Sequence, residues 1–558
     1  MDGGDAGPGT VPRVGADDVM RLARSAELRC TPARAAVLAP HLTALLDGAD
    51  ALAAAATAPP PADDALAARS LQVPSAPPAT ATPAAGGLAP GGTDGGDAFL
   101  SIRELARLYR TGERSPVAVT GALLRRISAA QPRLNAFVTV LADSAMAGAR
   151  ASEARIRAGL GRGPLDGVAV ACKDNIDTAG IPTTCAARIR RDEVPEADAE
   201  VVHRLRASGA VLIGKTNLLE FAYGAVHPDF GQGNNPWDPA RTAGGSSSGS
   251  AAAVGAGLAF AALGTDTGGS IRIPAAYCGV VGLKPTLGAV STDGVFPLSW
   301  TLDHVGPIGR RVDDVALLLA VLDGAGPVAD PSAELALGEA GTGPAARLAG
   351  LRAAVPLDRH AGDLQAGVAA RWEDALRRLA AAGVRLDEVE LPSLAYADDA
   401  LLQIILPEAA VIHASWLRSR PQDYAPDTRL QLELGALAPG TAYVAAQLVR
   451  ERLVQETRRL LGDHDLIVTP TVAWVAPRSD PALAGPEGAA EARRSGPHNL
   501  TGVPAVTLPC GLGDDGLPVG LQLAAAWGRD RRLLEWAAAV EALLGGPLGP
   551  PPGWAQRG

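Results

Sequence analysis

The chain has 558 residues, and its 50 Lys and Arg against 60 Asp and Glu give a net charge of −10. This length allows a large buried core and exceeds one ordinary small domain. The acidic balance, without a sustained basic run, argues against a nucleic-acid-binding protein.

The five cysteines lie far apart, without CxxC or paired His/Cys spacing, and their odd number is typical of a reduced, cytoplasmic protein. The first residues, MDGGDAGPGT, have neither the charged nor the apolar region of a secretory signal. The longest apolar stretch, residues 251–263, is too short to cross a bilayer. We therefore expect a cytoplasmic protein without a membrane partner.

Two short helices are predicted within residues 16–56. Thr31 is placed to cap the second helix, and Pro32 to begin it. Pro40 is expected to kink this helix. Apolar residues recur in it at spacings of three and four and form a stripe of Ala35, Leu38, Leu42, Leu45, Ala49 and Leu52. Because a helix pair of this size cannot bury its stripe alone, we predict that residues 1–57 are an appendage packed on a larger domain.

A segment dense in Pro, Ala and Gly follows, and we interpret residues 58–97 as an extended, mostly disordered linker. Order is predicted to resume at the capping-box pattern Ser101-Ile-Arg-Glu104. Predicted helices, such as residues 116–130, then alternate with β-like runs at residues 167–172, 210–214, 465–470 and 505–510. This alternation indicates an α/β catalytic domain with a mostly buried sheet over residues 98–548, followed by a tail at 549–558.

Two clusters of serine and glycine, GGSSSGS and TDTGGS, flank a short apolar run within residues 244–279. Glycine permits close backbone approach, and neighbouring hydroxyls can be aimed at a reacting group. The first cluster matches G-x-S-x-G with Ser247 as nucleophile, a pattern that also needs a histidine partner. No candidate histidine lies in a loop that singles it out, whether His304, His413, His464 or His498. A phosphate-binding loop is disfavoured because no Lys-Ser or Lys-Thr closes the pattern.

A third arrangement uses no histidine and combines a serine nucleophile, a bridging serine and a lysine base. Lys173 ends a predicted strand, Ser246 lies in the first cluster and Ser270 ends the second. With NPWDPAR, CGVVGLKPT, DHVGPIGR and NLTGVPAVTLPCG, which occur in this order within residues 100–545, these segments resemble the amidase signature family of serine hydrolases. The resemblance implies a mixed, twisted central sheet covered by helices, and no metal or organic cofactor.

By this resemblance Lys173 is the base, Ser246 the bridging serine and Ser270 the nucleophile that becomes acylated. A cis peptide bond is implied before Ser246. Burial at the end of an apolar strand would lower the pKa of the lysine and make it a competent base. The oxyanion hole would consist of four backbone N–H groups, those of Thr267, Gly268, Gly269 and Ser270.

Other residues are predicted to support this triad structurally or to border the pocket. Asp266 and Arg272 are expected to brace the nucleophile loop as an internal pair, and Ser247 to bind backbone groups through its hydroxyl. The segment TTCAARI at residues 183–189 departs from the common family pattern and is placed to border the pocket. Leu298 and Trp300 are candidates for an apolar wall.

The expected function is cleavage of a carboxamide-type C–N bond in a small-molecule amide through a Ser270 acyl-enzyme. Two alternatives stay open: a glutamine-hydrolysing subunit of a tRNA-dependent amidotransferase, and a hydrolase of carbamates or carboxylated ureas. The N-terminal helix pair is similar to small helical subunits that accompany family members of both kinds. A non-catalytic binding protein is disfavoured because all three triad positions are retained. The sequence does not fix the oligomeric state, and a homodimer is compatible with it.

Overall fold

The computed structural model describes residues 13–57, 69–71, 97–324, 343–356, 362–481, 485–513 and 515–554. Within these residues, twelve strands form one mixed sheet in the order β1-β9-β8-β10-β12-β11-β6-β7-β5-β3-β4-β2. The strands are β1 (Arg69–Ser70), β2 (Phe137–Val140), β3 (Ala169–Lys173), β4 (Val211–Thr216), β5 (Ala261–Asp266), β6 (Val281–Lys284), β7 (His304–Gly309), β8 (Arg352–Pro356), β9 (Arg385–Val389), β10 (Leu466–Pro470), β11 (Ala505–Leu512) and β12 (Pro518–Ala524).

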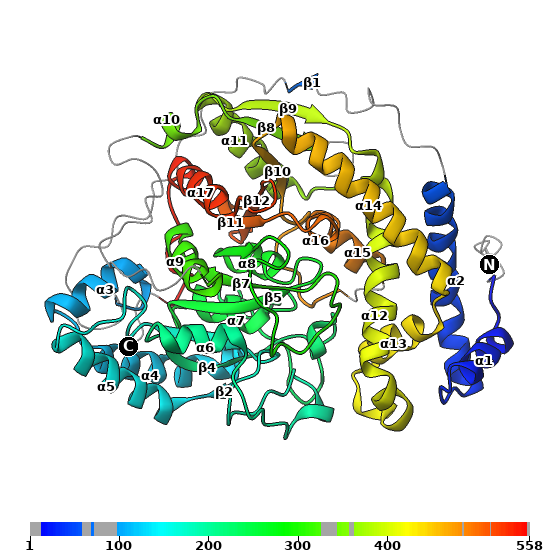
Figure 1. Ribbon diagram of the computed structural model, residues 1–558, viewed down its shortest axis with the longest axis horizontal. Coiled ribbons are helices and arrows are strands. Elements are labelled where there is room, and N and C mark those ends of the chain that lie inside the picture. Colours follow the sequence, from blue (N-terminus) through cyan, green and yellow to red (C-terminus); the bar gives the residue numbers. More distant parts are fainter. Residues whose placement is uncertain are drawn as a thin grey trace, which may run out of the picture.

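Helices surround this sheet, as Figure 1 shows. In the described part of the chain they are α1 (Ala16–Ser25), α2 (Pro32–Thr57), α3 (Ile102–Thr111), α4 (Pro116–Leu134), α5 (Ala142–Arg157), α6 (Glu200–Ala207), α7 (Ser248–Gly255), α8 (Arg272–Cys278), α9 (Val312–Leu322), α10 (Pro344–Leu348), α11 (Ala366–Ala381), α12 (Ala397–Ser419), α13 (Pro426–Leu437), α14 (Gly440–Asp463), α15 (Pro486–Ala492), α16 (Gly496–Thr501) and α17 (Asp530–Leu544). The architecture is α/β with a mixed sheet, as the sequence predicts.

Around β8 and β10, the strands divide their side chains between two apolar clusters, one on each face of the sheet. In β10, Leu466 and Val468 belong to one cluster and Ile467 to the other. This alternation follows from the two-residue repeat of a strand. The first cluster includes residues of α9, α11 and α17, and the second those of α12 and α14. Both faces are therefore covered, which is why the predicted strands read as continuous apolar runs.

The predicted local signals agree with the observed elements. The four β-like runs are β3, β4, β10 and β11, and the helix expected at residues 116–130 is α4. Ser101 accepts a hydrogen bond from the backbone N–H of Glu104, which confirms the capping box that begins α3. Thr31 Oγ1 accepts one from the Arg34 N–H at 3.2 Å, which confirms the cap of α2. Helix α2 continues through Pro40, an exposed position, so the lost backbone hydrogen bond does not end the helix.

The N-terminal helix pair packs against the body of the protein through the predicted stripe, whose six residues are all buried. Helix α2 contacts α12, α13 and α14, and the blue α2 lies beside these yellow and orange helices in Figure 1. Polar contacts reinforce the packing: Gln403 donates to the Leu45 carbonyl at 2.6 Å, and Arg34 pairs with Glu433 at 2.6 Å. The helix pair is thus seated on the same cluster of side chains as the second face of the sheet.

Two short segments depart from the expected boundaries. Residues Arg69–Ser70, within the expected linker, form the edge strand β1 against β9. The rest of the expected linker, 58–68 and 72–96, lies outside the described residues. The expected tail is anchored by Trp554, whose indole N–H donates to the Pro236 carbonyl at 2.7 Å.

Helix α12, with the turn before it, is long and apolar enough to span a membrane by length and composition alone. Most of the apolar window is buried inside the protein, where α12 is enclosed by α2, α13 and α14. Its apolar character is therefore explained by its place in the core.

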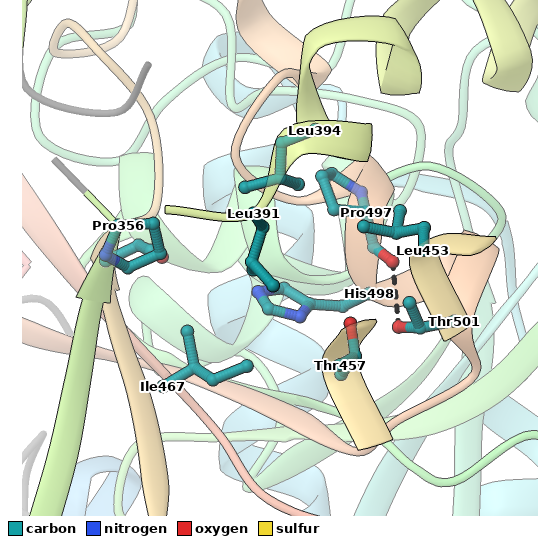
Figure 2. Close-up of a pocket in the computed structure, with 10 residues that line it drawn as sticks. Pro356, Leu391, Leu394, Leu453, Thr457, Ile467, Pro497, His498 and Thr501 are labelled. Carbon is teal, nitrogen blue, oxygen red and sulfur yellow. Dashed lines mark hydrogen bonds between the residues drawn. The ribbon is translucent and has the colours of Figure 1, made fainter. Parts of the chain in front are cut away.

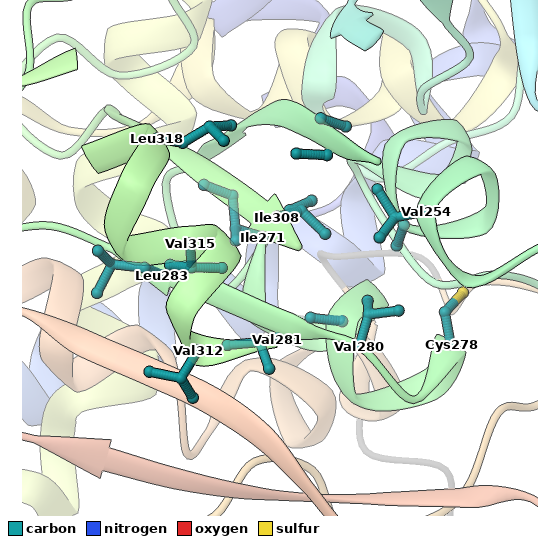
Figure 3. Packing of buried hydrophobic residues seen from close by; sticks show 14 of the residues in the cluster. Val254, Ile271, Cys278, Val280, Val281, Leu283, Ile308, Val312, Val315 and Leu318 are labelled. Atoms are coloured by element: carbon teal, nitrogen blue, oxygen red, sulfur yellow. The ribbon is translucent and has the colours of Figure 1, made fainter. Parts of the chain in front are cut away.

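A dense apolar core supports the serine-rich segments. Ile271, the residue after Ser270, is fully buried and packs in the first cluster with Val281, Leu283 and Ile308. Figure 3 shows these side chains converging between the strands and α9. The backbone that carries Ser270 is thus attached directly to a close-packed interior, which limits its movement.

Candidate active site

Lys173 lies at the carboxyl end of β3, beside the parallel strand β5. Its side chain is fully buried, and its Nζ lies 2.8 Å from Ser246 Oγ and 2.7 Å from Thr265 Oγ1. Burial lowers the pKa of Lys173 to about 7, although Asp266 and Asp303 act in the opposite direction. A large fraction of this lysine is therefore neutral near pH 7 and able to accept a proton.

Ser246 follows a cis peptide bond from Gly245, as the family resemblance implies. Its carbonyl accepts a hydrogen bond from the Leu219 N–H at 3.2 Å. The next residue, Ser247, donates its N–H to the Ser270 carbonyl at 3.1 Å. The two serine-rich clusters are thus tied together by their backbones, which brings Ser246 and Ser270 to the same pocket.

This pocket is lined by both serines. Its other walls come from distant parts of the chain, namely Leu219, Ala222, Tyr223, Gly224, Gly245, Thr267, Gly268, Ile273, Leu298, Ile405, Asp480, Pro481, Gly488, Glu491 and Ala492. Ser246 is 2% exposed, whereas Ser270 is half-buried. A substrate in the pocket can therefore reach Ser270 while Ser246 and Lys173 stay behind it.

The nucleophile loop is fixed by a fully buried ion pair between Asp266 and Arg272. The guanidinium donates to both carboxylate oxygens, at 3.0 and 2.9 Å, and also to Asn499 Oδ1 at 2.6 Å. Burial by itself raises the pKa of the Asp266 carboxyl, but Arg272 and Asn499 outweigh it and hold that pKa well below its usual range. Asp266 is therefore a permanent anion that accepts hydrogen bonds from its own loop.

Gly269 has a structural role in this loop. Its N–H donates to Asp266 Oδ1 at 2.9 Å, and its φ is +142°. A Cβ at this position would lie 2.2 Å from Ser495 Oγ, so only glycine fits. The prediction of four oxyanion donors thus needs one change, because the Gly269 N–H is already used within the loop. Among the described residues, three of the predicted N–H groups have no protein acceptor: those of Thr267, Gly268 and Ser270.

The alternative nucleophile, Ser247, is engaged elsewhere. Its hydroxyl donates to the Thr265 carbonyl at 3.2 Å and accepts from the Thr265 N–H at 3.4 Å. His304, one of the candidate histidine partners of Ser247, lies between Lys284 Nζ and backbone carbonyls. Burial lowers the pKa of His304 well below the usual value. The Ser247 hydroxyl thus binds backbone groups on β5, and no histidine of the described chain is hydrogen-bonded to it.

The predicted pocket borders are found at different depths. Leu298 lines the pocket of Ser246 and Ser270. Trp300 is 54% exposed and lines a neighbouring pocket together with Asp303 and His304. Residues 183–189 do not line the pocket. Ala186 packs on Ala222, which does, so this segment supports the pocket from behind.

A second cavity lies away from the two serines and shares no lining residue with their pocket. Figure 2 shows it between Pro356, Leu391, Leu453 and His498, where apolar side chains predominate. It contains none of the predicted site residues.

Two polar residues of the site were missed by sequence reasoning. Thr265 contacts Lys173 through its hydroxyl, and Asn499 holds both Asp266 and Arg272. Thr265 immediately precedes Asp266 on β5, so its place beside the lysine follows only from the pairing of β3 with β5. Asn499 lies in the motif NLTGVPAVTLPCG, and this motif is the one signal in the sequence that could have pointed to it.

Comparison with known proteins shows which family the chain resembles. Residues 118–534 match the family model described as Amidase. The chain is 40% identical over 477 residues to a glutamyl-tRNA(Gln) amidotransferase subunit of Symbiobacterium thermophilum, and the match covers 79% of this chain and 96% of that protein. It is 40% identical over 426 residues to an amidase of Pseudomonas putida, with 75% and 90% covered. A crystal structure of an amidase superposes with a TM-score of 0.71 at 35% identity, covering 80% of this chain and all of that one.

Proposed function

This chain belongs to the Amidase family and is a hydrolase that acts on amide bonds, and we propose that it does so through an acyl-enzyme on Ser270. The observation that carries the proposal is the contact of 2.8 Å between Lys173 Nζ and Ser246 Oγ, beside a pocket that Ser246 shares with Ser270. A lysine with a pKa of about 7 supplies the base that such a serine needs.

In the proposed reaction, Ser270 Oγ passes its proton to Ser246 Oγ, and Ser246 passes its own proton to the neutral Lys173. Ser270 Oγ then bonds to the carbonyl carbon, and the carbonyl oxygen takes the negative charge. The free N–H groups of Thr267, Gly268 and Ser270 are the donors available to that oxygen. Return of the proton to nitrogen breaks the C–N bond and releases ammonia or an amine, and water then hydrolyses the ester.

We further propose that residues 98–548 are the catalytic domain and that residues 1–57 are an appendage to it. The contacts of α2 with α12 and α14 support this division. The five cysteines form no disulfide, which supports the cytoplasmic location expected from the sequence.

A second candidate function is favoured by the similarity to the glutamyl-tRNA(Gln) amidotransferase protein. In that case the substrate would be glutamine, and the ammonia would pass to a partner protein. Carbamates and carboxylated ureas remain a further substrate class for the same triad.

The proposal is tested by ammonia release from a panel of primary amides, carbamates, ureas and glutamine. The purified chain alone should release ammonia from at least one amide, and Ser270→Ala should abolish this. Glutaminase activity that requires an added amidotransferase partner would favour the second candidate. Activity that persists in Ser270→Ala would refute the acyl-enzyme.

A further inference from the structure

The pocket that holds Ser246 and Ser270 also carries two carboxylates, Asp480 and Glu491. Glu491 lies at the end of α15 and Asp480 on the segment that precedes it. The mechanism above uses neither residue. Both line the same cavity as the nucleophile, so any substrate that reaches Ser270 meets these two carboxyl groups.

Asp480 is oriented toward the serine backbone. Its Oδ2 accepts a hydrogen bond from Thr242 Oγ1 at 2.7 Å, whereas its Oδ1 is inaccessible to water and accepts none from another residue. A Cβ on Gly245 would lie 3.5 Å from this Oδ1, which places the free oxygen next to the residue that precedes Ser246. Because this oxygen has no exposed surface, a ligand in the pocket does not contact it, and Asp480 acts on such a ligand through its charge at short range.

Glu491 is only 8% exposed. Its Oε1 accepts a hydrogen bond from the hydroxyl of Tyr277 at 2.7 Å, and among the described residues its Oε2 has no partner. A side chain that is more than nine-tenths buried, lines a cavity and keeps one oxygen free is placed to bind a group that enters that cavity.

The walls of the pocket supply no cation to balance these two carboxylates. Among the described residues that line the pocket there is no lysine, arginine or histidine. Burial raises the pKa of Glu491 to about 8, with a further contribution from Asp480, and burial raises the pKa of Asp480 to about 6. Buried acids respond in this way when nothing positive lies beside them.

We propose that Asp480 and Glu491 form a cation subsite, so that this enzyme selects amides that carry a positively charged group and rejects those that carry a negative one. This inference rests on the proposed function and specifies its substrate class. The chemistry that fits is a primary to quaternary ammonium group set a few bonds from the scissile amide. By the same reasoning, a substrate carboxylate finds no counter-charge on the described walls, which disfavours a carboxylated urea. Glutamine carries both an ammonium and a carboxylate group, so the subsite fits only one end of it.

The test uses three primary amides of matched shape. They are 4-(trimethylammonio)butanamide, its neutral isostere 5,5-dimethylhexanamide and the anion glutaramate, each also made with one methylene fewer and one more. A second series carries the same three end groups on the amine side of an acetamide. The quaternary ammonium keeps its charge at every pH, so only the enzyme titrates. Ammonia or amine release gives kcat and KM for each compound.

We expect kcat/KM for the cation to exceed that of the neutral isostere by at least about tenfold in one of the two series, and the anion to fall below the neutral compound. In Glu491→Gln and in Asp480→Asn the ratio of cation to neutral should fall toward one, mainly through KM. Glu487→Gln is the matched control, because Glu487 lies on the same short helix but is exposed, and its ratio should stay that of the parent enzyme.

The outcomes separate the two proposals. Equal kcat/KM for cation and neutral amide in both series, or a preference for the anion, would overturn the cation subsite while leaving the amidase in place. A charge preference that survives in the Glu491→Gln/Asp480→Asn double variant would overturn it too. Release of nothing from any compound, with the folded protein confirmed by circular dichroism, would instead count against the proposed function itself.

Discussion

Lys173 is the residue whose protonation state controls the proposed chemistry. It is fully buried, and its ammonium form has only hydroxyl and carbonyl oxygens as close partners, while Asp266 is held by Arg272. Desolvation therefore lowers the pKa of Lys173 by more than the carboxylates of Asp266 and Asp303 raise it, and the neutral amine is stabilised. A solvated lysine would titrate near pH 10.4 and would be a poor base under ordinary conditions.

We predict that kcat rises with pH through about 7 and then levels off, because only the neutral Lys173 accepts the serine proton. Lys173→Ala should lower kcat about 10²- to 10⁴-fold, and Lys173→Arg should lower it as much, since a guanidinium does not release its proton. Steady-state rates from pH 5 to 10 on a neutral amide measure both effects. A rise in kcat only above pH 9, or a well-folded Lys173→Arg enzyme with near-normal turnover, would exclude the lysine base.

The grouping of single residues at one site could be predicted from the sequence only where a motif carried them. Lys173, Ser246, Ser270, Asp266 and Arg272 were placed by recognisable segments. The use of the Gly269 N–H by Asp266 could not be predicted, because it depends on the exact path of the loop between β5 and α8. The placement of Asp480 and Glu491 could not be predicted either, since nothing in their local sequence indicates that they share a pocket with Ser270.

At the scale of elements, the loop between β5 and α8 is the part that the fold supports most heavily. Ser270 is flanked by Gly269, which adopts a positive φ against Ser495, and by Ile271, which is buried in the main core. Ser495 Oγ in turn donates to the Gly268 carbonyl at 2.6 Å. The loop is thus held at successive residues, which keeps its free N–H groups in fixed positions.

Gly269→Ala should disrupt this loop, because the new methyl group would lie 2.2 Å from Ser495 Oγ. We expect kcat to fall at least about 10²-fold, the loss typical of one misplaced oxyanion donor. The matched control is Gly288→Ala, which also has a positive φ but has nothing within 4 Å of the added carbon. That variant should lose about 1 kcal/mol of stability and keep its turnover. Equal kcat in the two variants would show that the loop tolerates the displacement.

Element positions were predictable where the pattern was long. The strands β3, β4, β10 and β11 and the helices α2, α3 and α4 follow from apolar runs and capping signals. Strand β1 was missed because it has only two residues, Arg69 and Ser70, and exists only through its pairing with β9. Elements of this kind are defined by a tertiary contact and leave no local signal.

At the scale of the whole molecule, the N-terminal helix pair and the active site are joined through α12. One face of this helix meets α2, where Gln403 donates to the Leu45 carbonyl. Its other residues reach the site, because Ile405 lines the pocket and Leu401 lies 3.3 Å from where a Cβ on Gly268 would be. The appendage therefore supports the wall of the pocket from outside.

Truncation of the stripe should loosen this support. Leu38 is 1% exposed, and we expect Leu38→Ala to cost about 2–5 kcal/mol of stability in the region of α2. Its neighbour Val37 is 48% exposed, so Val37→Ala should change stability by no more than about 0.5 kcal/mol. Amide hydrogen exchange of α2 and α12 measures the difference. Equal protection in the two variants would mean that the helix pair is held by its polar contacts alone.

The central claim is that Ser270 is the residue acylated by substrate. The most direct measurement is to label the active protein with a fluorophosphonate and to locate the adduct by peptide mass spectrometry. An activated serine attacks phosphorus as it does carbon. We predict a single adduct on Ser270 that is absent in Ser270→Ala and in Lys173→Ala. An adduct on Ser247, or labelling that is unchanged in Ser270→Ala, would contradict the mechanism.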